Sequence, residues 1–319
     1  MDLVFCGTPL FAVPTLERLV NAGHSVRLVV TQPDRPRGRG MEMAFSPVKQ
    51  AALNLGLPVT QPEKIRSNEE LRARLSALRP EAIIVVGYGR IIPQWMIDLP
   101  PLGNLNVHAS LLPKYRGAAP IQWAVASGDT VTGVTIMRID TGLDTGDILA
   151  QAEEPIETTD TSVTLAPRLA ILGAKLMSAT LSKLQRAEIT PQPQDHSRAT
   201  IAPILTKEHG HIDFTWTAKE ISDRLRGFQP WPGAYTTFRG KQLTVHSATP
   251  HQHASVALSP GELRLNNDAL LVGAASTSAL ELHEVQLEGK KRMSARDFAN
   301  GYRPQPGERL GSAIQVSPA

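Results

Sequence analysis

The chain opens on blocks of apolar and polar residues whose lengths alternate between those of strands and those of helices. An apolar run at residues 3–6 precedes apolar positions at helical spacing, namely Leu16, Leu19 and Val20, and a second apolar run ends near Val30. Apolar residues at helical spacing indicate one buried helix face, and short apolar runs bounded by turns indicate strands. A strand, a helix and a strand within about thirty residues form a right-handed crossover, which requires parallel strands.

The same alternation recurs further along the first half. Residues 68–78 have helical spacing, and the apolar run at 82–86 follows them. The pattern predicts an α/β fold class with a doubly wound, mostly parallel sheet of the Rossmann type. In such sheets, ligands bind beyond the carboxyl ends of the strands, where the strand order reverses. The strand ends expected to meet at that cleft are residues 7–9, 87–89 and 106–110.

The second half has a different pattern. Residues 189–206 are rich in Pro, Thr, Gln and Ser and have no regular period, which is typical of a linker. Beyond them, one helical stretch at 218–228 precedes short, turn-bounded runs rich in β-forming residues. These runs predict a small antiparallel β-barrel or sandwich, and an OB-like barrel is the expectation. The predicted domains are 1–188 and 207–319, joined by the linker.

Composition narrows the class of protein. The chain has 319 residues, of which 41% are hydrophobic and 20% charged, as in folded globular proteins. Its one cysteine, Cys6, excludes an internal disulfide and a cysteine-based zinc site. Neither a signal peptide nor an apolar run of about 20 residues is found, so a cytoplasmic location is expected. The net charge of +3 permits a nucleic-acid partner without implying one.

Candidate chemistry lies at one strand end and in one loop. Asn106 and His108 alternate along a strand, so their side chains point the same way. An amide that donates to a developing oxyanion and an imidazole that carries a proton suit acyl transfer. The loop that follows residues 133–139 carries Asp140, Asp144 and Asp147. A carboxylate beside the imidazole would fix its orientation and favour its charged form.

Two other types of site are not favoured. The aspartate loop lacks the ligand spacing of an EF-hand, so no metal site is expected there. The turn Gly7-Thr8-Pro9 lacks both the dinucleotide-binding glycine spacing and the Walker lysine, so a tight turn is expected and a nucleotide site is not.

Two long motifs, NVHASLLPKYRGAAPIQWA at 106–124 and GVTIMRIDTGLDTGDILAQ at 133–151, resemble those of the folate-dependent formyltransferases. The stretches VFCGTPLFAVPTLERL, TQPDRPRGRG, SPVKQAA and FQPWPGAYTTFRG match the family in the same order, so the resemblance covers nearly the whole chain. Within the family, the chain is most similar to members that formylate the methionine carried by initiator tRNA.

The resemblance implies the activity and the residues that carry it. Asn106, His108 and Asp144 are expected to surround the formyl carbon of the co-substrate 10-formyltetrahydrofolate, with no metal. Two further segments are expected to line the folate site. These are Ser110, Leu111, Leu112 and Pro113 in one segment, and Gly87, Tyr88, Gly89 and Ile91 in the other.

The resemblance implies that initiator methionyl-tRNA is the partner. The protein is expected to be a monomer and not to associate with a membrane. Arg35, Arg37 and Arg39 lie in an insertion suited to phosphate contacts, although Met41-Glu42-Met43 stands where other members have lysines. A second basic group is expected to contact tRNA, with help from Arg224 and Arg226. It consists of Lys290, Lys291 and Arg292.

Two alternatives remain open. A formyltransferase acting on a small amine, such as a sugar nucleotide or glycinamide ribonucleotide, would share the three catalytic side chains. A noncatalytic folate-binding or RNA-binding protein would retain the fold without needing them. The basic insertion and the β-rich second domain favour tRNA over the small amine.

Overall fold

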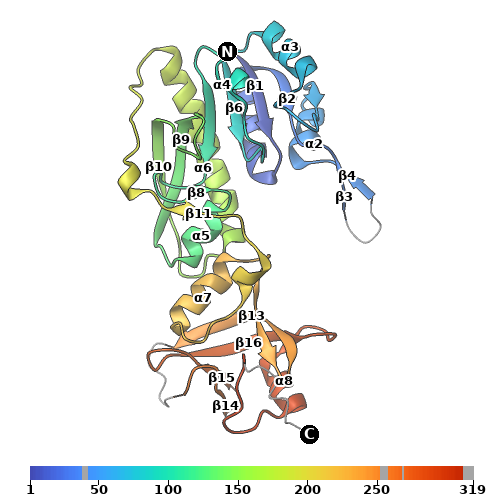
Figure 1. Cartoon of the computed structure of the whole chain (residues 1–319), viewed down its shortest axis with the longest axis vertical. Helices are drawn as coiled ribbons and strands as arrows, with labels where there is room; N and C mark the ends of the chain where they lie inside the picture. Colours follow the sequence, from blue (N-terminus) through green and yellow to red (C-terminus); the bar gives the residue numbers. More distant parts are fainter. Residues whose placement is uncertain (38–41, 252–257, 268, 312–319) are drawn as a thin grey trace. The chain divides into compact units, whose positions relative to one another are not determined.

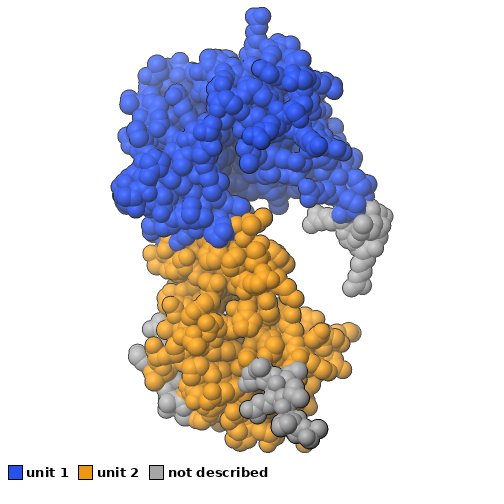
Figure 2. All heavy atoms as spheres, in the orientation of Figure 1, with its two compact units in different colours: residues 1–121, 131–156, 164–203 blue, residues 122–130, 157–163, 204–319 orange. Residues whose placement is uncertain are grey.

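A computed structural model describes residues 1–37, 42–251, 258–267 and 269–311. The chain forms two compact units, coloured separately in Figure 2. The first comprises Met1–Ile121, Val131–Ile156 and Thr164–Pro203. The second comprises Gln122–Thr130, Glu157–Val163 and Ile204–Ala319.

A seven-stranded sheet organises the first unit, in the order β10-β9-β7-β6-β1-β2-β5. Strands β7, β6, β1, β2 and β5 are parallel, and β9 and β10 are antiparallel to their neighbours. The strand order reverses between β1 and β6, where a binding crevice is expected in a doubly wound sheet. The predicted fold class is confirmed. The strands are β1 (Asp2–Gly7), β2 (Ser25–Val30), β5 (Val59–Thr60), β6 (Ala82–Val86), β7 (Asn104–His108), β9 (Val131–Arg138) and β10 (Ile148–Pro155).

Helix α3 illustrates how sequence determines an element here. The side chain of Asn68 caps the helix by accepting the Leu71 N–H at 2.8 Å, which satisfies a backbone donor that lacks a partner within the helix. Leu71 and Leu75, one helical turn apart, are buried in a cluster with Val4 and Ile83 of the sheet. The helix predicted at 68–78 is thus confirmed.

The opposite face of the sheet is covered by α6. A Cβ added to Gly173 of this helix would lie 2.7 Å from Val107 Cγ1 and 3.4 Å from Val134 Cγ1, so α6 packs closely on β7 and β9. Because side chains alternate along a strand, Asn106 and His108 point to the other face. The helices of the first unit are α1 (Val13–Asn21), α2 (Pro47–Asn54), α3 (Glu69–Leu78), α4 (Gln94–Ile97) and most of α6 (Ser162–Gln185), whereas most of α5 (Pro120–Ala126) belongs to the second unit.

Two small ribbons occur where the sequence indicated irregular chain. Within the basic insertion, β3 (Arg35–Arg37) pairs antiparallel with β4 (Glu42–Ala44), and Figure 1 shows this ribbon projecting from the sheet. Within residues 189–206, β11 (Ile201–Ala202) pairs parallel with β8 (Arg116–Gly117). Composition gave no sign of either, because such short ribbons depend on pairing with a partner strand.

The second unit contains an antiparallel sheet, in the order β12-β13-β16-β15-β14, with β17 pairing to β16. The antiparallel β-sheet expected in the second domain is confirmed. Phe238 of β12 packs edge-on against Phe298 of α8 at 5.0 Å between ring centroids. The elements are α7 (Ala218–Gly227), β12 (Ala234–Phe238), β13 (Lys241–His251), β14 (Leu263–Asn266), β15 (Ala269–Gly273), β16 (Ala279–Leu287), β17 (Met293–Ser294) and α8 (Ala295–Tyr302).

None of the helices within the described ranges is both long enough and apolar enough to cross a bilayer.

Candidate active site

The end of β7 brings two polar side chains to the carboxyl edge of the sheet. Asn106 pairs in register with Val85 of β6 and Met137 of β9, and it is half-buried. Its amide has no hydrogen-bond partner among the described residues, so it is available to a ligand. His108, two positions on, is only 6% exposed and lies on the same side of the strand.

Both ring nitrogens of His108 face oxygen atoms. Nε2 lies 2.9 Å from the Tyr115 carbonyl oxygen, and Nδ1 lies 3.7 Å from Asp144 Oδ2. A carbonyl oxygen only accepts, so Nε2 is the donor to Tyr115. The second distance exceeds that of a hydrogen bond, so Nδ1 is the nitrogen left for a reacting group.

The loop between β9 and β10 presents Asp144 to this imidazole. Asp144 has φ +52°, a conformation uncommon outside glycine, and its Oδ2 accepts the Gly117 N–H at 2.8 Å. Asp140 instead caps a turn, because it accepts the Gly142 N–H at 3.0 Å and the Thr145 hydroxyl at 2.8 Å. Of the three aspartates in this loop, Asp144 is the one that faces His108.

A buried polar network lies behind the aspartate loop. Gln194 Nε2 donates to the carbonyl oxygens of Asp144 and Gly146, at 2.9 and 2.7 Å. Its Oε1 accepts from Arg116 Nε and Nη2, at 3.2 and 2.6 Å. Arg116 Nη2 also lies 3.1 Å from His196 Nδ1. Sequence reasoning missed Gln194 entirely, because a glutamine in a Pro-rich polar stretch carries no signal of burial.

The segment 110–113 is held by hydrogen bonds to its backbone. The Thr135 hydroxyl donates to the Ser110 carbonyl at 2.7 Å and accepts the Leu112 N–H at 3.1 Å. Gln151 Nε2 donates to the Leu112 carbonyl at 2.9 Å, and the Leu112–Pro113 peptide is cis. Ser110 is fully buried and its hydroxyl donates to the Lys114 carbonyl at 2.6 Å, so this side chain is already occupied.

Replacing Thr135 by valine is expected to lower the free energy of unfolding by about 2–3 kcal/mol. The valine keeps the shape but removes a hydroxyl that serves Ser110, Leu112 and Gln151, which leaves buried polar groups unpaired. Urea denaturation measures the loss. Thr145→Val, which removes an exposed hydroxyl bonded to Asp140, is the control. Equal losses in the two variants would contradict this account of the segment.

The loop at residues 87–91 combines two glycines with one exposed apolar side chain. Gly87 and Gly89 have φ of +54° and +74°. Between them, Tyr88 is 1% exposed, and burial raises the pKa of its phenol. Its carbonyl oxygen accepts from Gln32 Nε2 at 2.8 Å and from the Thr8 hydroxyl at 3.2 Å. Ile91 is 90% exposed and is the side chain of this loop most available to a ligand.

The basic insertion is described in part. Arg35 is exposed and donates to Gln32 Oε1 at 3.2 Å. Arg37 and Glu42 are placed by their backbone in the ribbon, whereas Arg39 and Met41 lie outside the described residues.

The basic group of the second unit follows β16 in a turn. Lys290 and Lys291 are exposed. Arg292 forms an ion pair with Glu284 of β16, so part of its charge is already compensated.

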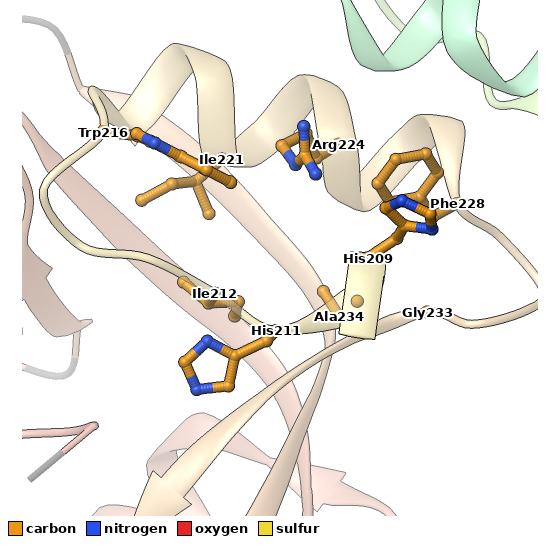
Figure 3. A pocket seen from close by; sticks show the side chains of 10 residues that line it. His209, His211, Ile212, Trp216, Ile221, Arg224, Phe228, Gly233 and Ala234 are labelled. Atoms are coloured by element: carbon orange, nitrogen blue, oxygen red, sulfur yellow. The ribbon is translucent and has the colours of Figure 1, made fainter. Parts of the chain in front are cut away.

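Arg224 has a different environment, which Figure 3 shows within the second unit. Its guanidinium carbon lies 4.4 Å from the Trp216 ring centre and 5.0 Å from that of Phe228. The adjoining space has a volume of about 10 Å³, which suffices for one water molecule. His209 and His211 form part of its lining. Burial lowers the pKa of Arg224, and its Nε is buried without a hydrogen-bond partner.

An open depression of about 610 Å³ lies over the loop between β9 and β10, lined by residues of that loop together with His196. No group of three or more His, Cys, Asp or Glu residues in the described part of the chain could hold a metal ion.

Comparison with known proteins gives the relationship of the chain. The family model Formyl transferase matches residues 1–181, and Formyl transferase, C-terminal domain, matches 204–303. Curated proteins named methionyl-tRNA formyltransferase from Koribacter versatilis and Acidobacterium capsulatum are 68% and 59% identical. Each alignment covers 98% of this chain, with 99% and 100% of the respective relative.

Solved structures share the fold at much lower identity. An N-formyltransferase from Helicobacter canadensis, in complex with folinic acid and dTDP-3-aminofucose, has a TM-score of 0.64 and 17% identity over 88% of this chain and 98% of its own. HypX from Aquifex aeolicus, in complex with tetrahydrofolic acid, has a TM-score of 0.60 and 16% identity over 98% of this chain and 50% of its own. The solved structures show the fold alone, whereas the curated relatives are 59–68% identical over nearly the whole chain. The chain therefore belongs to the methionyl-tRNA formyltransferase family.

Proposed function

We propose that the chain transfers the formyl group of 10-formyltetrahydrofolate to the α-amino group of methionine on initiator methionyl-tRNA. It is an enzyme, a transferase of one-carbon groups used in translation initiation. The observation that carries the chemical part is the placement of the free Asn106 amide beside a His108 imidazole that faces Asp144 at 3.7 Å. The choice of methionyl-tRNA as the substrate is supported by the two relatives of that name, which are 68% and 59% identical to this chain.

The three side chains have distinct tasks in this mechanism. The amine of methionine attacks the formyl carbon, and negative charge grows on the formyl oxygen. The Asn106 amide and protonated His108, through Nδ1, donate to that oxygen and stabilise the charge. Asp144 faces the imidazole and accepts the proton that leaves the amine, directly or through water. The tetrahedral intermediate then collapses: the bond between the formyl carbon and the folate nitrogen breaks, and that nitrogen takes up the proton released by the amine, so that formyl-methionyl-tRNA and tetrahydrofolate leave. Nε2 stays bonded to the Tyr115 carbonyl, which holds the ring in place.

The edge of the sheet suits a folate. The co-substrate supplies the activated formyl group, and the amide, imidazole and carboxylate are the donors and acceptors that its transfer requires. Ile91, 90% exposed beyond the end of β6, offers an apolar contact to a flat ring. Gly87, Gly89 and the segment 110–113 complete the proposed folate wall. Buried Tyr88, Ser110 and Leu112 would contribute there through their backbone.

The tRNA is proposed to contact both basic regions. Arg35, with Arg37 and Arg39, forms the first, and the turn with Lys290, Lys291 and Arg292 forms the second. The catalytic and tRNA-binding domains are proposed at 1–188 and 207–319. We propose that the protein acts in the cytoplasm, where initiator tRNA is charged, and that it acts as a monomer.

A panel of acceptors tests the function. Formyl transfer from 10-formyltetrahydrofolate is measured to charged initiator methionyl-tRNA, uncharged tRNA, free methionine and an amino-sugar nucleotide. Rapid product with the charged tRNA alone is expected. Product with the amino sugar alone would keep the chemistry at Asn106, His108 and Asp144 but replace the substrate by a small amine.

Lys291→Ala is expected to raise KM for charged tRNA several-fold and to leave KM for the folate unchanged. Each lost phosphate contact lowers the slope of log affinity against log salt by about 1. Binding at several salt concentrations measures the slope. Arg186→Ala removes an exposed charge that is paired with Glu188 and serves as the control. A slope in Lys291→Ala equal to that of the parent would remove this residue from the tRNA surface.

A further inference from the structure

We propose that Gln194 is a positioning residue for the Asp144 carboxylate, acting together with the buried guanidinium of Arg116. The inference rests on the proposed function, since it takes Asp144 as the group that orients His108. Gln194 lies in the segment whose composition predicts a linker, yet it is only 6% exposed.

The amide of Gln194 holds the backbone of the aspartate loop at two points. Nε2 donates to the carbonyl oxygens of Asp144 and Gly146, at 2.9 and 2.7 Å. These two carbonyls flank Thr145, so one buried amide fixes the chain on both sides of the loop tip. An amide nitrogen carries two hydrogens, and both are used here.

Arg116 determines which way this amide points. A guanidinium has donors only, and Nε and Nη2 of Arg116 both lie within hydrogen-bond distance of Gln194 Oε1. The oxygen of the amide must therefore face Arg116, and the nitrogen must face the loop. Arg116 is 6% exposed, and a buried charge needs such partners, so each side chain holds the other in place.

The residue that follows Arg116 also contacts Asp144, through the carboxylate and not through the backbone. Gly117, directly after Arg116, donates its N–H to Asp144 Oδ2 at 2.8 Å. The carboxylate is thus held by Gly117 and the backbone behind it by Gln194. Asp144 has φ +52°, in the left-handed region that aspartate adopts more readily than most residues other than glycine, and the contacts from Gln194 and Gly117 favour this conformation of the loop. Loss of the Gln194 amide would let the carboxylate move relative to His108.

The segment that carries Gln194 is itself anchored beside the loop. The N–H and carbonyl of Gln192 pair with the backbone of Ile148, the first residue of β10, at 2.9 and 2.8 Å. Further on, the Thr200 carbonyl accepts the Arg116 N–H at 2.8 Å. Gln194 is therefore placed between two backbone attachments and does not depend on its own side chain for its position.

Gln194→Glu separates the positioning role from packing. Glutamate keeps the volume and the oxygen that faces Arg116, but it replaces the two donors with an oxygen aimed at two carbonyls. We expect kcat to fall about 10- to 100-fold, because small displacements of catalytic groups have effects of this size. KM for folate and for tRNA should stay within about twofold, since neither is bound by this loop backbone in the proposal.

Gln192→Glu is the matched control. It makes the same amide-to-acid change, and adds the same charge, at an exposed residue two positions away whose contacts to Ile148 use only its backbone. A kcat in Gln194→Glu equal to that of Gln192→Glu would overturn the proposal. Should Gln194→Glu fold poorly, Arg116→Lys, which keeps the charge but loses the paired donors, is expected to lower kcat in the same way.

A double-mutant cycle with Asp144→Asn identifies the route of the effect. If Gln194 acts through Asp144, adding Gln194→Glu to Asp144→Asn should cost less than about twofold further. The same 10- to 100-fold loss in both backgrounds would show that Gln194 acts elsewhere and would overturn the proposal.

Hydrogen exchange at Gly117 gives a readout that needs no substrate. Its N–H is bonded to Asp144 Oδ2, so exchange should accelerate in Gln194→Glu relative to Gln192→Glu. Unchanged exchange would contradict the positioning role. Failure of the parent enzyme to formylate charged tRNA would instead contradict the proposed function alone, because the exchange measurement does not depend on the acceptor.

Discussion

His108→Ala is expected to lower kcat for formyl transfer by about 10²–10⁴-fold, the range associated with a positioned proton carrier. In the proposed mechanism the imidazole donates to the formyl oxygen, and its Nδ1 lies 3.7 Å from Oδ2 of Asp144. Single-turnover rates with saturating folate and charged tRNA measure the change without interference from product release.

His108→Gln tests whether the loss of turnover in His108→Ala results from a loss of structure. The ring is 6% exposed and its Nε2 donates to the Tyr115 carbonyl, so alanine also leaves a buried acceptor without a partner. Glutamine supplies an amide N–H for Tyr115 but cannot carry a proton. Its thermal denaturation is expected to stay close to that of the parent, with turnover as low as in His108→Ala. Near-parental turnover in either variant would remove His108 from the mechanism.

Asn106→Ala is expected to lower kcat by about 10²–10³-fold with little change in stability, as for the removal of one preorganised oxyanion donor. The amide is half-buried and unbonded among the described residues, so its loss breaks no hydrogen bond within them. Turnover and urea denaturation of the same preparation separate catalysis from folding.

Asn104→Ala is the control for this change on the same strand. Asn104 is 1% exposed, and its Nδ2 donates to the carbonyl oxygens of Met96 and Ile97, at 2.8 and 3.1 Å. Its loss is expected to affect unfolding and to leave kcat near that of the parent. If both variants lose turnover equally, the role of Asn106 is to stabilise the strand and not to take part in the reaction.

The sequence predicted those parts of the fold whose cause is local. Asn68 caps a helix whose Leu71 and Leu75 face the sheet, and all three features appear in the spacing of residues. Strand ends could be aligned for the same reason, because apolar runs end where polar side chains begin. The alternation of Asn106 and His108 therefore predicts, from the sequence alone, that both side chains lie on one side of one strand.

Features that depend on distant partners could not be predicted in this way. Gln194 is buried because Arg116 and the aspartate loop, far from it in sequence, lie around it. Nothing in a stretch of Pro, Gln and Ser distinguishes such a residue from a solvated one. The orientation of Tyr88 is a similar case, since a tyrosine between two glycines fits an exposed loop as well as a core position.

The division of the chain into two units limits how this enzyme can be taken apart or rebuilt. The backbone leaves the first unit at Ile121, returns at Val131, leaves again at Ile156, returns at Thr164 and crosses for the last time after Pro203. No single cut therefore yields either unit intact, and a piece ending at 188 would also lack Gln194 and β11. Exchange of one module for another between relatives, in the laboratory or by recombination of genes, would have to carry these interleaved segments along. The two family models match the separate stretches 1–181 and 204–303, whereas the compact units interleave along the chain.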